Sequence, residues 1–599
     1  MLAASVQNAV RAGVLVCSAL AACVSLPARS APVISLVPDG QSRQARAPAD
    51  FYVFAPAVSG EEADVEVLTL RFTSATTLIR IASTSRDFVI EQGGSCVAGR
   101  AFAFGDTCSL RMRFVPQGAG NRLGRLTIEH TADTGKPAGI GLGGNGYAPV
   151  VSFTPAIINT VPGSYVSGAG TISNATSLAV DGGDILYIAD TGNDRMKEVD
   201  SSGNLVQTAL NPIATPASLA VDSFGIIYTA NTHGSTYYFS IFYPWGSQTA
   251  YGYAYTSSNC TASAPCAFSA VGMNYPANMS IDANNNLFFE EGTAGAAEMP
   301  VGSISGGSGT LNLWHLSDQF AYSSGSPGSF AADAFGNIYT YYRFSTSTCY
   351  ILTESLYNAE YLPSATRVAG GVACGYSGDG GPAADAEIST SVGQIAFDLA
   401  GNMYFADNGN QRVRRVDNAS GQINTIAGNG AAGYSGDGGA ATSASLNSPT
   451  GVAVNSQGAV YIISGDGASA QVIRKVGPDG ILAFNSQLVG STSSPLTVTV
   501  ANTGNSALQL TGVVLTGTNA ADFSIDPNTT NCNLTAGAIL GARQSCKIGV
   551  VFKLAASETG ARSANLVLLD NSVTGQNIVS LTGTGVATSD RIFASNFGG

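Results

Sequence analysis

The feature that most constrains the fold is a short pattern that recurs six times between residues 177 and 464. Each copy has an apolar stretch ending in Asp or Asn, a turn rich in small polar residues, and a second apolar stretch. An aromatic residue always stands six positions after the acid or amide. The acids and the amide are Asp181, Asp222, Asp282, Asp333, Asp398 and Asn455, and the aromatic residues are Tyr187, Tyr228, Phe288, Tyr339, Tyr404 and Tyr461. Alternating apolar residues around an Asx/Gly turn predict a β-hairpin in every copy.

The spacing of these hairpins predicts the architecture. Successive copies lie 41 to 65 residues apart, which leaves room for two further strands per unit. Six units of four antiparallel strands are typical of a six-bladed β-propeller, here over residues 150–480. The sequence INTV at residues 158–161 repeats INTI at residues 423–426. We therefore expect an outer strand near residues 157–162 that closes the last blade and leaves no free edge.

Three passages carry a family resemblance. LYIADTGNDRMKEVD at residues 186–200 and MYFADNGNQRVRRVD at residues 403–417 resemble the NHL repeat, as does the passage from residue 423 to residue 454. The copies around Asn278 and Ser329 match only in their first hairpin and lack the Asn-x-Arg signature. The resemblance implies an NHL-type propeller.

A second repeat flanks the first. Residues 87–146 align with residues 522–585: each has Asp-Phe, two cysteines, an alternating strand that begins at the second cysteine, and a final Gly-x-Gly. Period-2 patterning over about one hundred residues is typical of an immunoglobulin-like sandwich. The two segments resemble ASH/HYDIN-type domains of bacterial "choice-of-anchor D" proteins. The predicted fold is all-β, with the propeller between sandwiches at residues 31–148 and 481–587.

The first thirty residues resemble a secretory signal, with Arg11 before an apolar stretch that is too short to span a bilayer. Alternatively, the Leu-Ala-Ala-Cys sequence at residues 20–23 is a lipobox, which would tether the protein to a membrane through Cys23. Residues 588–599 form a short tail. We expect an exported protein at the cell surface, in the periplasm or outside the cell.

Eight cysteines outside the signal fall into local pairs. In an exported chain an even number favours disulfides. The expected pairs are Cys96 with Cys108, Cys260 with Cys266, Cys349 with Cys374, and Cys532 with Cys546.

The heptapeptide GYSGDGG occurs at residues 375–381 and again at residues 433–439. We interpret both copies as connectors from the rim of one blade to the centre of the next, with Asp379 or Asp437 capping the turn. The alternative is a calcium loop that uses the carboxylate and main-chain carbonyls as ligands. Cys374 stands where the second copy has Ala432, so the first connector is expected to be held by a disulfide.

A ring of polar residues is expected nine positions after each hairpin acid or amide. Related six-bladed lactonases bind a divalent cation through Glu, Asn and Asp, so the resemblance implies a metal site. The alternative is that Asp190 and Asp407, within ADTGN and ADNGN, only hydrogen-bond their own turns. The residues at these positions are Asp190, Asn231, Glu291, Tyr342, Asp407 and Ser464, of which Asp190, Asn231, Glu291 and Asp407 are the candidate metal ligands.

An aromatic cluster lies in residues 235–257. Tyr251, Tyr253 and Tyr255 alternate, so they share one face of a strand, and Trp245 lies in the preceding turn. They either pack between blades or form a stacking platform for a sugar or peptide.

Composition narrows the function. The net charge of −13, with only 11% charged residues, argues against nucleic-acid binding, and three histidines make zinc or His-based catalysis improbable. No catalytic arrangement can be assembled from the sequence. We therefore expect a non-enzymatic exported binding or scaffold protein that recognises an extracellular protein or glycan through its propeller, without a cofactor. The alternative is a metal-dependent hydrolase or lyase with a site at the channel mouth, and calcium is the candidate metal.

Overall fold

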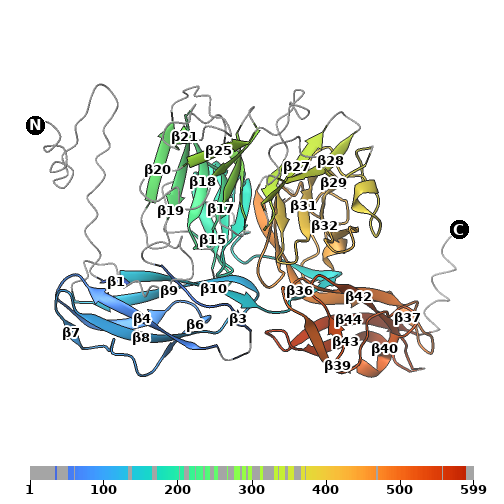
Figure 1. Ribbon diagram of the computed structural model, residues 1–599. Coiled ribbons are helices and arrows are strands. Elements are labelled where there is room, and N and C mark those ends of the chain that lie inside the picture. The colour runs from blue at the N-terminus through green and yellow to red at the C-terminus, as the bar shows by residue number, and fades with distance from the viewer. Residues whose placement is uncertain are drawn as a thin grey trace, which may run out of the picture.

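The computed structural model describes the following residues: 34–36, 51–59, 61, 63–131, 138–164, 172–200, 203–207, 215–222, 224–233, 236–242, 248–253, 266–267, 276–282, 286–291, 295–299, 310–314, 329–334, 336–343, 348–355, 366–371, 373–466, 470–555 and 557–587. Within these ranges the chain is all-β, and its only helical turns are of the 3-10 type, such as Thr191–Asn193 (η1). Figure 1 shows two sandwiches below a group of smaller sheets.

The N-terminal sandwich consists of two sheets around a core that includes Leu68, Phe72 and Phe114. The first sheet has the order β1 (Ile34–Leu36), β4 (Val65–Phe72), β8 (Thr107–Phe114), β6 (Phe88–Glu91). The second has the order β2 (Phe51–Val53), β10 (Ala138–Tyr147), β9 (Gly120–His130), β5 (Thr76–Ser83), β7 (Ala101–Phe102), and β3 (Ala57–Val58) also pairs with β10.

The C-terminal sandwich repeats this strand order around a core that includes Val498, Phe552 and Leu581. Its first sheet has the order β11 (Val151–Thr154), β38 (Leu496–Asn502), β42 (Ser545–Phe552), β40 (Phe523–Asp526). Its second has the order β36 (Gln471–Ala483), β44 (Gln576–Val586), β43 (Gly560–Asp570), β39 (Leu508–Thr516), β41 (Ile539–Leu540), and β37 (Gln487–Leu488) also pairs with β44. Alternating burial along β8 reflects the period-2 patterning of the sequence.

Six smaller sheets each begin with one of the repeated hairpins, and we call them repeat sheets 1 to 6. Sheet 1 contains β13 (Ser177–Val180), β14 (Leu186–Asp190), β15 (Arg195–Val199) and β16 (Leu205–Gln207). Sheet 2 contains β17 (Pro216–Val221), β18 (Ile227–His233), β19 (Thr236–Phe242) and β20 (Gln248–Tyr253). Sheet 3 contains β22 (Pro276–Ile281), β23 (Leu287–Glu291), β24 (Gly295–Met299), β25 (Thr310–Trp314) and β21 (Cys266–Ala267).

The remaining repeat sheets follow the same order. Sheet 4 contains β26 (Phe330–Ala332), β27 (Asn337–Arg343), β28 (Cys349–Ser355) and β29 (Thr366–Ala369). Sheet 5 contains β30 (Ile395–Phe397), β31 (Met403–Asp407), β32 (Arg412–Val416) and β33 (Ile423–Ala427). Sheet 6 contains β34 (Gly451–Val454), β35 (Val460–Gly465), the first half of β36, and β12 (Ala156–Thr160).

The first strands of the repeat sheets contact one another in chain order, and β34 of sheet 6 contacts β13 of sheet 1. Side chains join neighbouring first strands: the Ser218 hydroxyl accepts a hydrogen bond from the Met279 N–H at 2.8 Å. In sheet 6, β12 pairs antiparallel with β36, with Ile158 opposite Val476. Strands that are about 300 residues apart in the chain thus lie side by side and close this sheet.

The domain boundaries differ from the expected ones at two places. Residues 151–154, which the sequence places in the propeller, form β11 and pair with β38 of the C-terminal sandwich. Strand β36 continues through the expected boundary at residue 480, because its end pairs in parallel with β44. Sheet 6 and the C-terminal sandwich therefore share one continuous strand.

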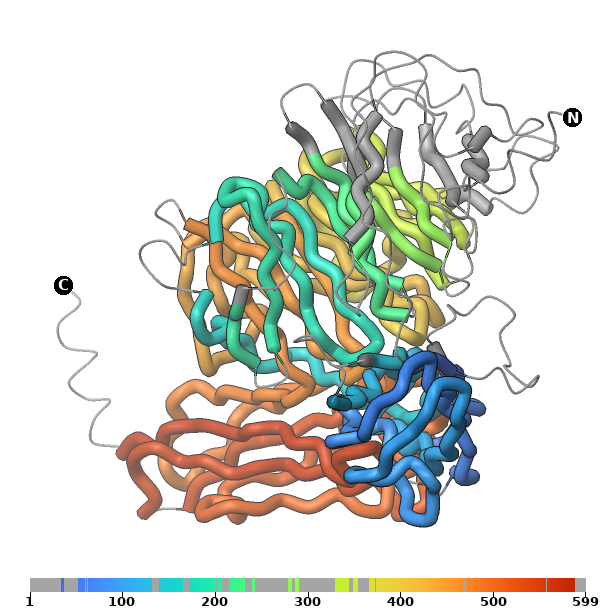
Figure 2. The backbone as a smooth tube through the Cα atoms, turned by 90° about the vertical axis from the view of Figure 1, so that its left-hand side faces the viewer, coloured from blue at the N-terminus to red at the C-terminus, as the bar shows by residue number. Residues whose placement is uncertain are grey.

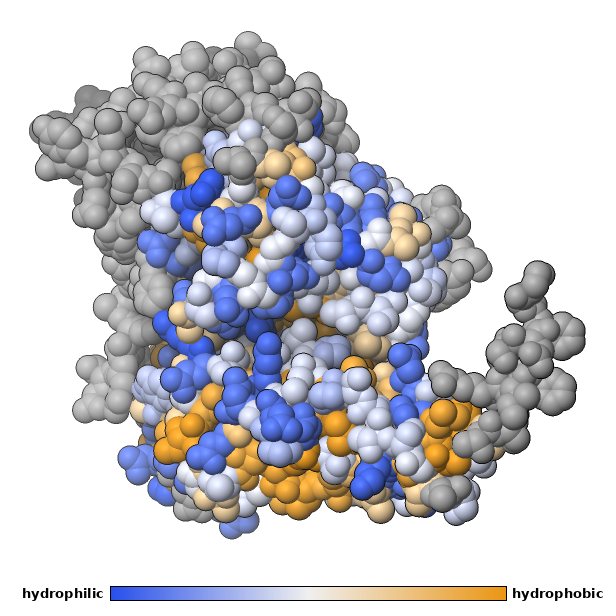
Figure 3. All heavy atoms as spheres, turned by 90° about the vertical axis from the view of Figure 1, so that its right-hand side faces the viewer, coloured by the Kyte–Doolittle hydropathy of each residue, from blue (hydrophilic) through white to orange (hydrophobic). Residues whose placement is uncertain are grey.

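The two sandwiches lie side by side beneath the repeat sheets (Figure 2). Arg122 of the N-terminal sandwich is 2.8 Å from Asp184 of sheet 1 and 3.2 Å from Asp87 of its own sandwich. The Leu123 N–H also donates to the Gly182 carbonyl at 3.1 Å. On the surface seen in Figure 3, apolar side chains gather mainly over the C-terminal sandwich, where Val514, Ile539 and Val573 are exposed.

Candidate binding site

The hairpin acids form a repeated turn structure at the end of the repeat sheets that faces the sandwiches. The Asp222 carboxylate accepts hydrogen bonds from the N–H groups of Phe224 at 2.9 Å and Ile226 at 2.8 Å, and from the Tyr228 hydroxyl at 3.1 Å. Asp181 and Asp398 repeat the same three contacts. Asn455 accepts the two corresponding N–H groups through its amide oxygen. The spacing between the acid and the aromatic residue therefore lets one carboxylate bind both the turn and the Tyr hydroxyl, which stabilises the turn.

Burial raises the pKa of several of these carboxyl groups. Burial raises the pKa of Asp222 to about 7 and that of Asp181 to about 6, although the main-chain N–H groups oppose the shift. Burial likewise raises the pKa of Asp398. The phenol of Tyr404, beside Asp398, also has a raised pKa, because it is buried and faces that carboxylate.

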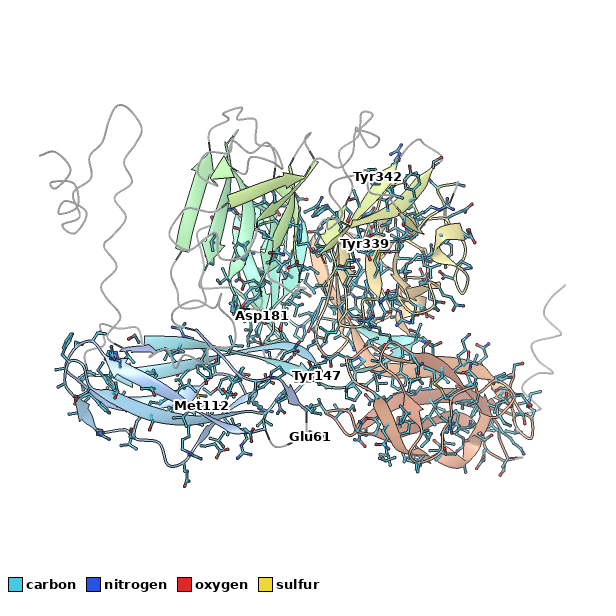
Figure 4. The ribbon with its side chains drawn as sticks, viewed as in Figure 1. Glu61, Met112, Tyr147, Asp181, Tyr339 and Tyr342 are labelled. Carbon is cyan, nitrogen blue, oxygen red and sulfur yellow. A yellow bond between two sulfur atoms is a disulfide. The ribbon has the colours of Figure 1, made fainter. Side chains whose placement is uncertain are left out.

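The positions nine residues after the hairpin acids lie at the opposite end of the repeat sheets. In sheet 4, Tyr342 lies farther from the sandwiches than Tyr339 (Figure 4). The Asp190 carboxylate is fully buried and accepts hydrogen bonds from the Ser173 N–H at 2.8 Å, the Asn193 amide at 2.8 Å and the Arg195 guanidinium at 2.6 Å. This carboxylate is thus bonded to its own turn, to the segment that precedes β13 and to the first residue of β15.

Asp407 of sheet 5 has an equivalent environment. It accepts the Ser389 N–H and the Asn410 side-chain amide, both at 2.9 Å. Burial raises its pKa, although the hydrogen bonds from Asn410 and Ser389 and the charge of Arg414 act in the opposite direction. In both ADTGN and ADNGN the acid is thus bonded to the Asn three positions later.

The other positions of the predicted ring have different neighbours. The Asn231 amide donates to the Ser240 hydroxyl at 3.1 Å, and the Ser464 hydroxyl accepts the Asn447 N–H at 2.9 Å. The side chain of Glu291 lies outside the described part of the structure. Among the residues that the structure describes, no three His, Cys, Asp or Glu side chains are arranged to hold a metal ion.

Both GYSGDGG segments pair with the outermost strand of a repeat sheet. The Gly380 N–H donates to the Ile423 carbonyl at 2.8 Å, and the Ile423 N–H donates to the Gly381 carbonyl at 3.0 Å. In the second copy, Gly438 and Gly439 exchange the same two bonds with Ile158 of β12. The connectors therefore cover the outer edges of sheets 5 and 6.

Asp379 and Asp437 each bind a buried arginine instead of capping the turn. Arg414 of β32 is fully buried and lies 2.7 Å from Asp379, and Arg474 of β36 lies 2.8 Å from Asp437. Burial alone would raise the pKa of Asp379, but hydrogen bonds from Thr425 and the charge of Arg414 hold it below its usual value. The sequence analysis did not identify these arginines, although both occupy the same position of a third strand.

The glycines of this segment are required by close packing. Gly378 and Gly436 have φ angles of +87° and +93°. A Cβ atom at either residue would lie 2.6 Å from the Cβ of Ala386 or Ala444. Repetition of the heptapeptide therefore reflects a backbone that accepts no side chain at this position.

Three disulfides join Cys96 to Cys108, Cys349 to Cys374 and Cys532 to Cys546, as predicted. The first and third occupy equivalent places in the two sandwiches. The pair Cys260 and Cys266 cannot be placed, because Cys260 and the side chain of Cys266 lie outside the described residues.

The aromatic cluster is described only in its backbone. Tyr251 and Tyr253 lie in β20, opposite Phe239 and Tyr237 of β19. Trp245 and Tyr255 lie outside the described residues. The main-chain register places Tyr251 and Tyr253 two residues apart on one strand, as the alternation predicts.

A cavity of about 670 Å³ lies at the centre of the ring of first strands. It is lined by the turn acids and Asn455, by Gln394 and Leu399 of the repeat sheets, and by residues from both sandwiches. The N-terminal sandwich contributes Ala119 and Asn121, and the C-terminal sandwich contributes Arg543. A volume of this size is within the range of small-molecule sites, which occur preferentially between domains.

Comparison with known proteins supports the propeller. Residues 429–540 match the Teneurin NHL domain, and no curated protein is similar to the chain in sequence. Within the part of the chain that the structure describes, no helix has the length and apolar character needed to cross a membrane.

Several solved structures resemble this chain, with low sequence identity and low TM-scores. A protein of unknown function from Bacteroides thetaiotaomicron has 13% identity and a TM-score of 0.39, covering 70% of this chain and 95% of its own. An auxiliary nutrient binding protein from Bacteroides ovatus has 14% identity and a TM-score of 0.37, covering 71% and 96%. Virginiamycin B lyase from Staphylococcus aureus, in an inactive form, has 10% identity and a TM-score of 0.30, covering 69% and 99%. The Teneurin NHL match, together with the repeated hairpins, supports an NHL-type β-propeller in this chain.

Proposed function

We propose that this chain is an exported, non-enzymatic binding or scaffold protein that recognises an extracellular protein or glycan. In this proposal the six repeat sheets are the blades of one NHL-type propeller, and the two sandwiches are immunoglobulin-like domains that support it. The observation that carries the proposal is the environment of Asp190 and Asp407. Both carboxylates are fully buried, and each is hydrogen-bonded to its own turn and to the segment that precedes its sheet, which leaves them poorly placed to bind a metal or a substrate.

The same observation argues against a metal-dependent hydrolase or lyase. A divalent cation needs several oxygen ligands that converge with free lone pairs. Asp190 instead accepts two N–H donors and the guanidinium of Arg195, whose positive charge would repel a cation. A non-enzymatic binding protein does not require oxygen ligands to converge on a metal ion.

The position of the sandwiches indicates which face of the propeller binds the partner. Both sandwiches lie against one face of the repeat sheets, so the opposite face is the better recognition surface (Figure 1). On that side β18 continues two residues past Asn231 to His233, paired with β19. The aromatic sequence of β19 and β20 supports a stacking platform there, because Tyr side chains are frequent among binding hot spots.

Export is proposed from the signal-like N-terminus and is supported by the three disulfides, which persist in oxidising compartments. A lipid anchor at Cys23 remains the alternative to release. Mass spectrometry of the purified mature protein distinguishes the two, since a lipid on Cys23 adds mass to an N-terminus at that residue.

The binding surface is tested with a panel of immobilised glycans and cell-envelope proteins, comparing the wild type with the double variant Tyr251→Ala/Tyr253→Ala. The control is Tyr147→Ala, because Tyr147 is 40% exposed but lies between the sandwiches (Figure 4). We expect the double variant to lose at least tenfold in affinity and the control to bind normally. Equal binding by all three proteins, or a loss confined to Tyr147→Ala, would place recognition elsewhere.

A further inference from the structure

The central cavity contains a feature that the binding proposal does not use. Arg543 lies in the turn between β41 and β42 and adopts a φ angle of +67°, in the left-handed region that favours glycine. It is exposed and lines the cavity, and no described residue forms an ion pair or hydrogen bond with its guanidinium. A non-glycine residue in this region stores strain, which is frequent at ligand sites.

The N-terminal sandwich provides an internal comparison for this turn. Its equivalent residue, between β7 and β8, is Gly105, with a φ angle of +87°. The main-chain contacts are the same: the Gly105 N–H donates to the Phe72 carbonyl at 2.8 Å, and the Arg543 N–H donates to the Asn502 carbonyl at 2.9 Å. Glycine satisfies the backbone geometry of this turn in the N-terminal sandwich, so the geometry does not explain why the C-terminal turn has Arg543.

The side-chain hydrogen bonds of the two turns also correspond. The Asp106 carboxylate accepts the Ala103 N–H at 2.8 Å, and the Gln544 amide oxygen accepts the Gly541 N–H at 2.9 Å. The two turns differ in what lies beside them. Only the C-terminal turn faces the cavity, and only there is the glycine replaced by a long cationic side chain.

Asn121 approaches the same cavity from the other sandwich. It is exposed and lines the cavity, and no described residue hydrogen-bonds its side-chain amide. Arg543 and Asn121, from two different domains, therefore line a cavity whose other walls are polar turns and apolar side chains. The cation pairs with one carboxylate, and the amide donates to and accepts from hydroxyl groups.

We propose that the cavity between the propeller and the two sandwiches binds a small hydroxylated monocarboxylate, such as a uronic acid, with its carboxylate on Arg543 and a hydroxyl group on Asn121.

The surrounding acids favour this class over more highly charged anions. Asp222 and Asp398 line the cavity, but their oxygens are bonded to their own turns, which reduces their effect on a single carboxylate. A dianion such as phosphate would be repelled more strongly by the five aspartates around the cavity. A neutral sugar would leave Arg543 unpaired.

The test is isothermal titration of the full chain with D-glucuronate and, separately, with D-glucose. The informative variant is Arg543→Gly, which copies the N-terminal turn and relieves the backbone strain. We expect the wild type to bind glucuronate at least tenfold more tightly than glucose, and Arg543→Gly to lose this preference without a fall in Tm. A surface control, Arg367→Ala, carries a substitution outside the cavity lining and should bind as the wild type does.

A second variant locates the ligand. Ala334 is exposed at the cavity wall, so Ala334→Trp should fill part of the space and weaken binding of glucuronate. The proposal is overturned if the wild type shows no preference for glucuronate, if Arg543→Gly binds it unchanged, or if Ala334→Trp has no effect. A fall in Tm of Arg543→Gly would assign the arginine a structural role instead. None of these results depends on Tyr251 or Tyr253, so the outcome is separate from that for the outer face.

Discussion

The Arg414 guanidinium lies 2.7 Å from the Asp379 carboxylate and is fully buried, while Asp379 remains one-third exposed. Arg414 also donates to the carbonyls of Glu387 and Ser377, at 2.7 and 2.8 Å. A single side chain from β32 thus binds Ser377 and Asp379 of the GYSGDGG segment, beside the main-chain pairing of Gly380 and Gly381 with Ile423. The aspartate of this heptapeptide pairs with the arginine and also accepts a hydrogen bond from the Tyr376 hydroxyl at 2.9 Å.

This relationship predicts unequal effects of removing the two partners. Arg414→Met would remove the donor to two part-buried carbonyls and the cation that faces both Asp379 and the fully buried Asp407, which lies 3.8 Å away. We expect it to lower the free energy of unfolding by about 3 kcal/mol. Asp379→Asn keeps an acceptor for Arg414, and the buried cation still faces Asp407 at 3.8 Å, so this variant should cost less than Arg414→Met. Urea denaturation of both variants measures the difference. Equal losses in the free energy of unfolding would contradict the assignment of Arg414 as the residue that stabilises this connector.

The turn acids predict a pH dependence. The pKa of Asp222 is about 7 in the folded protein and 3.8 for the unperturbed group, so the folded state holds a proton that the unfolded state releases. This carboxyl group therefore lowers the free energy of unfolding as pH rises from about 4 to about 7, by at most about 1.4 kcal/mol per pH unit.

Asp222→Asn should keep the turn, because Asn455 already accepts the same two N–H groups in sheet 6. We expect this variant to flatten the fall in stability between pH 4 and pH 7, and the reverse change, Asn455→Asp, to steepen it. Thermal unfolding across this pH range is the measurement. Parallel pH profiles for the wild type and Asp222→Asn would show that Asp222 is already ionised at low pH.

The disulfide between Cys349 and Cys374 closes a loop with a sequence separation of 25. Loop-closure entropy predicts that Cys349→Ala/Cys374→Ala lowers the free energy of unfolding by about 3 kcal/mol. Sheet 6 carries Ala432 in place of Cys374 and keeps the same connector. We therefore expect the pairing of Gly380 and Gly381 with β33 to persist, and hydrogen exchange at Ile423 reports on it. Loss of protection at Ile423 in the double variant would mean that the disulfide, and not Arg414, holds the connector.

Arg122 predicts coupling between the N-terminal sandwich and the propeller. Its side chain is 5% exposed and contacts Asp87, Asp184 and the Ser456 hydroxyl. Arg122→Met would leave two carboxylates without their cation, and we expect a loss of about 3 kcal/mol in stability. Hydrogen exchange should rise around residues 182–184 and 455–457. Arg80→Ala is the control, because Arg80 is 68% exposed and its ion pair with Glu129 spans 3.8 Å. An equal loss of stability in both variants would contradict a specific role of Arg122 in coupling the N-terminal sandwich to the propeller.

Much of the architecture could be predicted because its determinants are local in sequence. The acid, turn and aromatic residue of each hairpin lie within seven residues, so the pattern in residues 181–187 is sufficient to define a hairpin. The strand at residues 158–161 was recognisable because it copies residues 423–426, and β12 pairs with β36 accordingly. These signals need no knowledge of distant contacts.

The remaining features depend on partners far apart in the chain. Asp379 and Arg414 are separated by 35 residues, and nothing near either one indicates the other. Val151–Thr154 alternates as any strand does, and its assignment to β38 depends on an edge about 350 residues away. The exposure of Arg543 to a cavity likewise depends on the packing of three domains.

We propose that Asp190 and Asp407, at the ends of the repeat sheets that lie away from the sandwiches, maintain the fold and bind no metal. Metal analysis of the purified protein, followed by isothermal titration with Ca²⁺, is the test of this proposal, with Asp106→Asn as a control at an exposed turn. We expect no stoichiometric metal and no heat of binding. One tightly bound equivalent of a divalent cation, abolished by Asp190→Asn or Asp407→Asn but retained by Asp106→Asn, would contradict the account and favour the hydrolase or lyase.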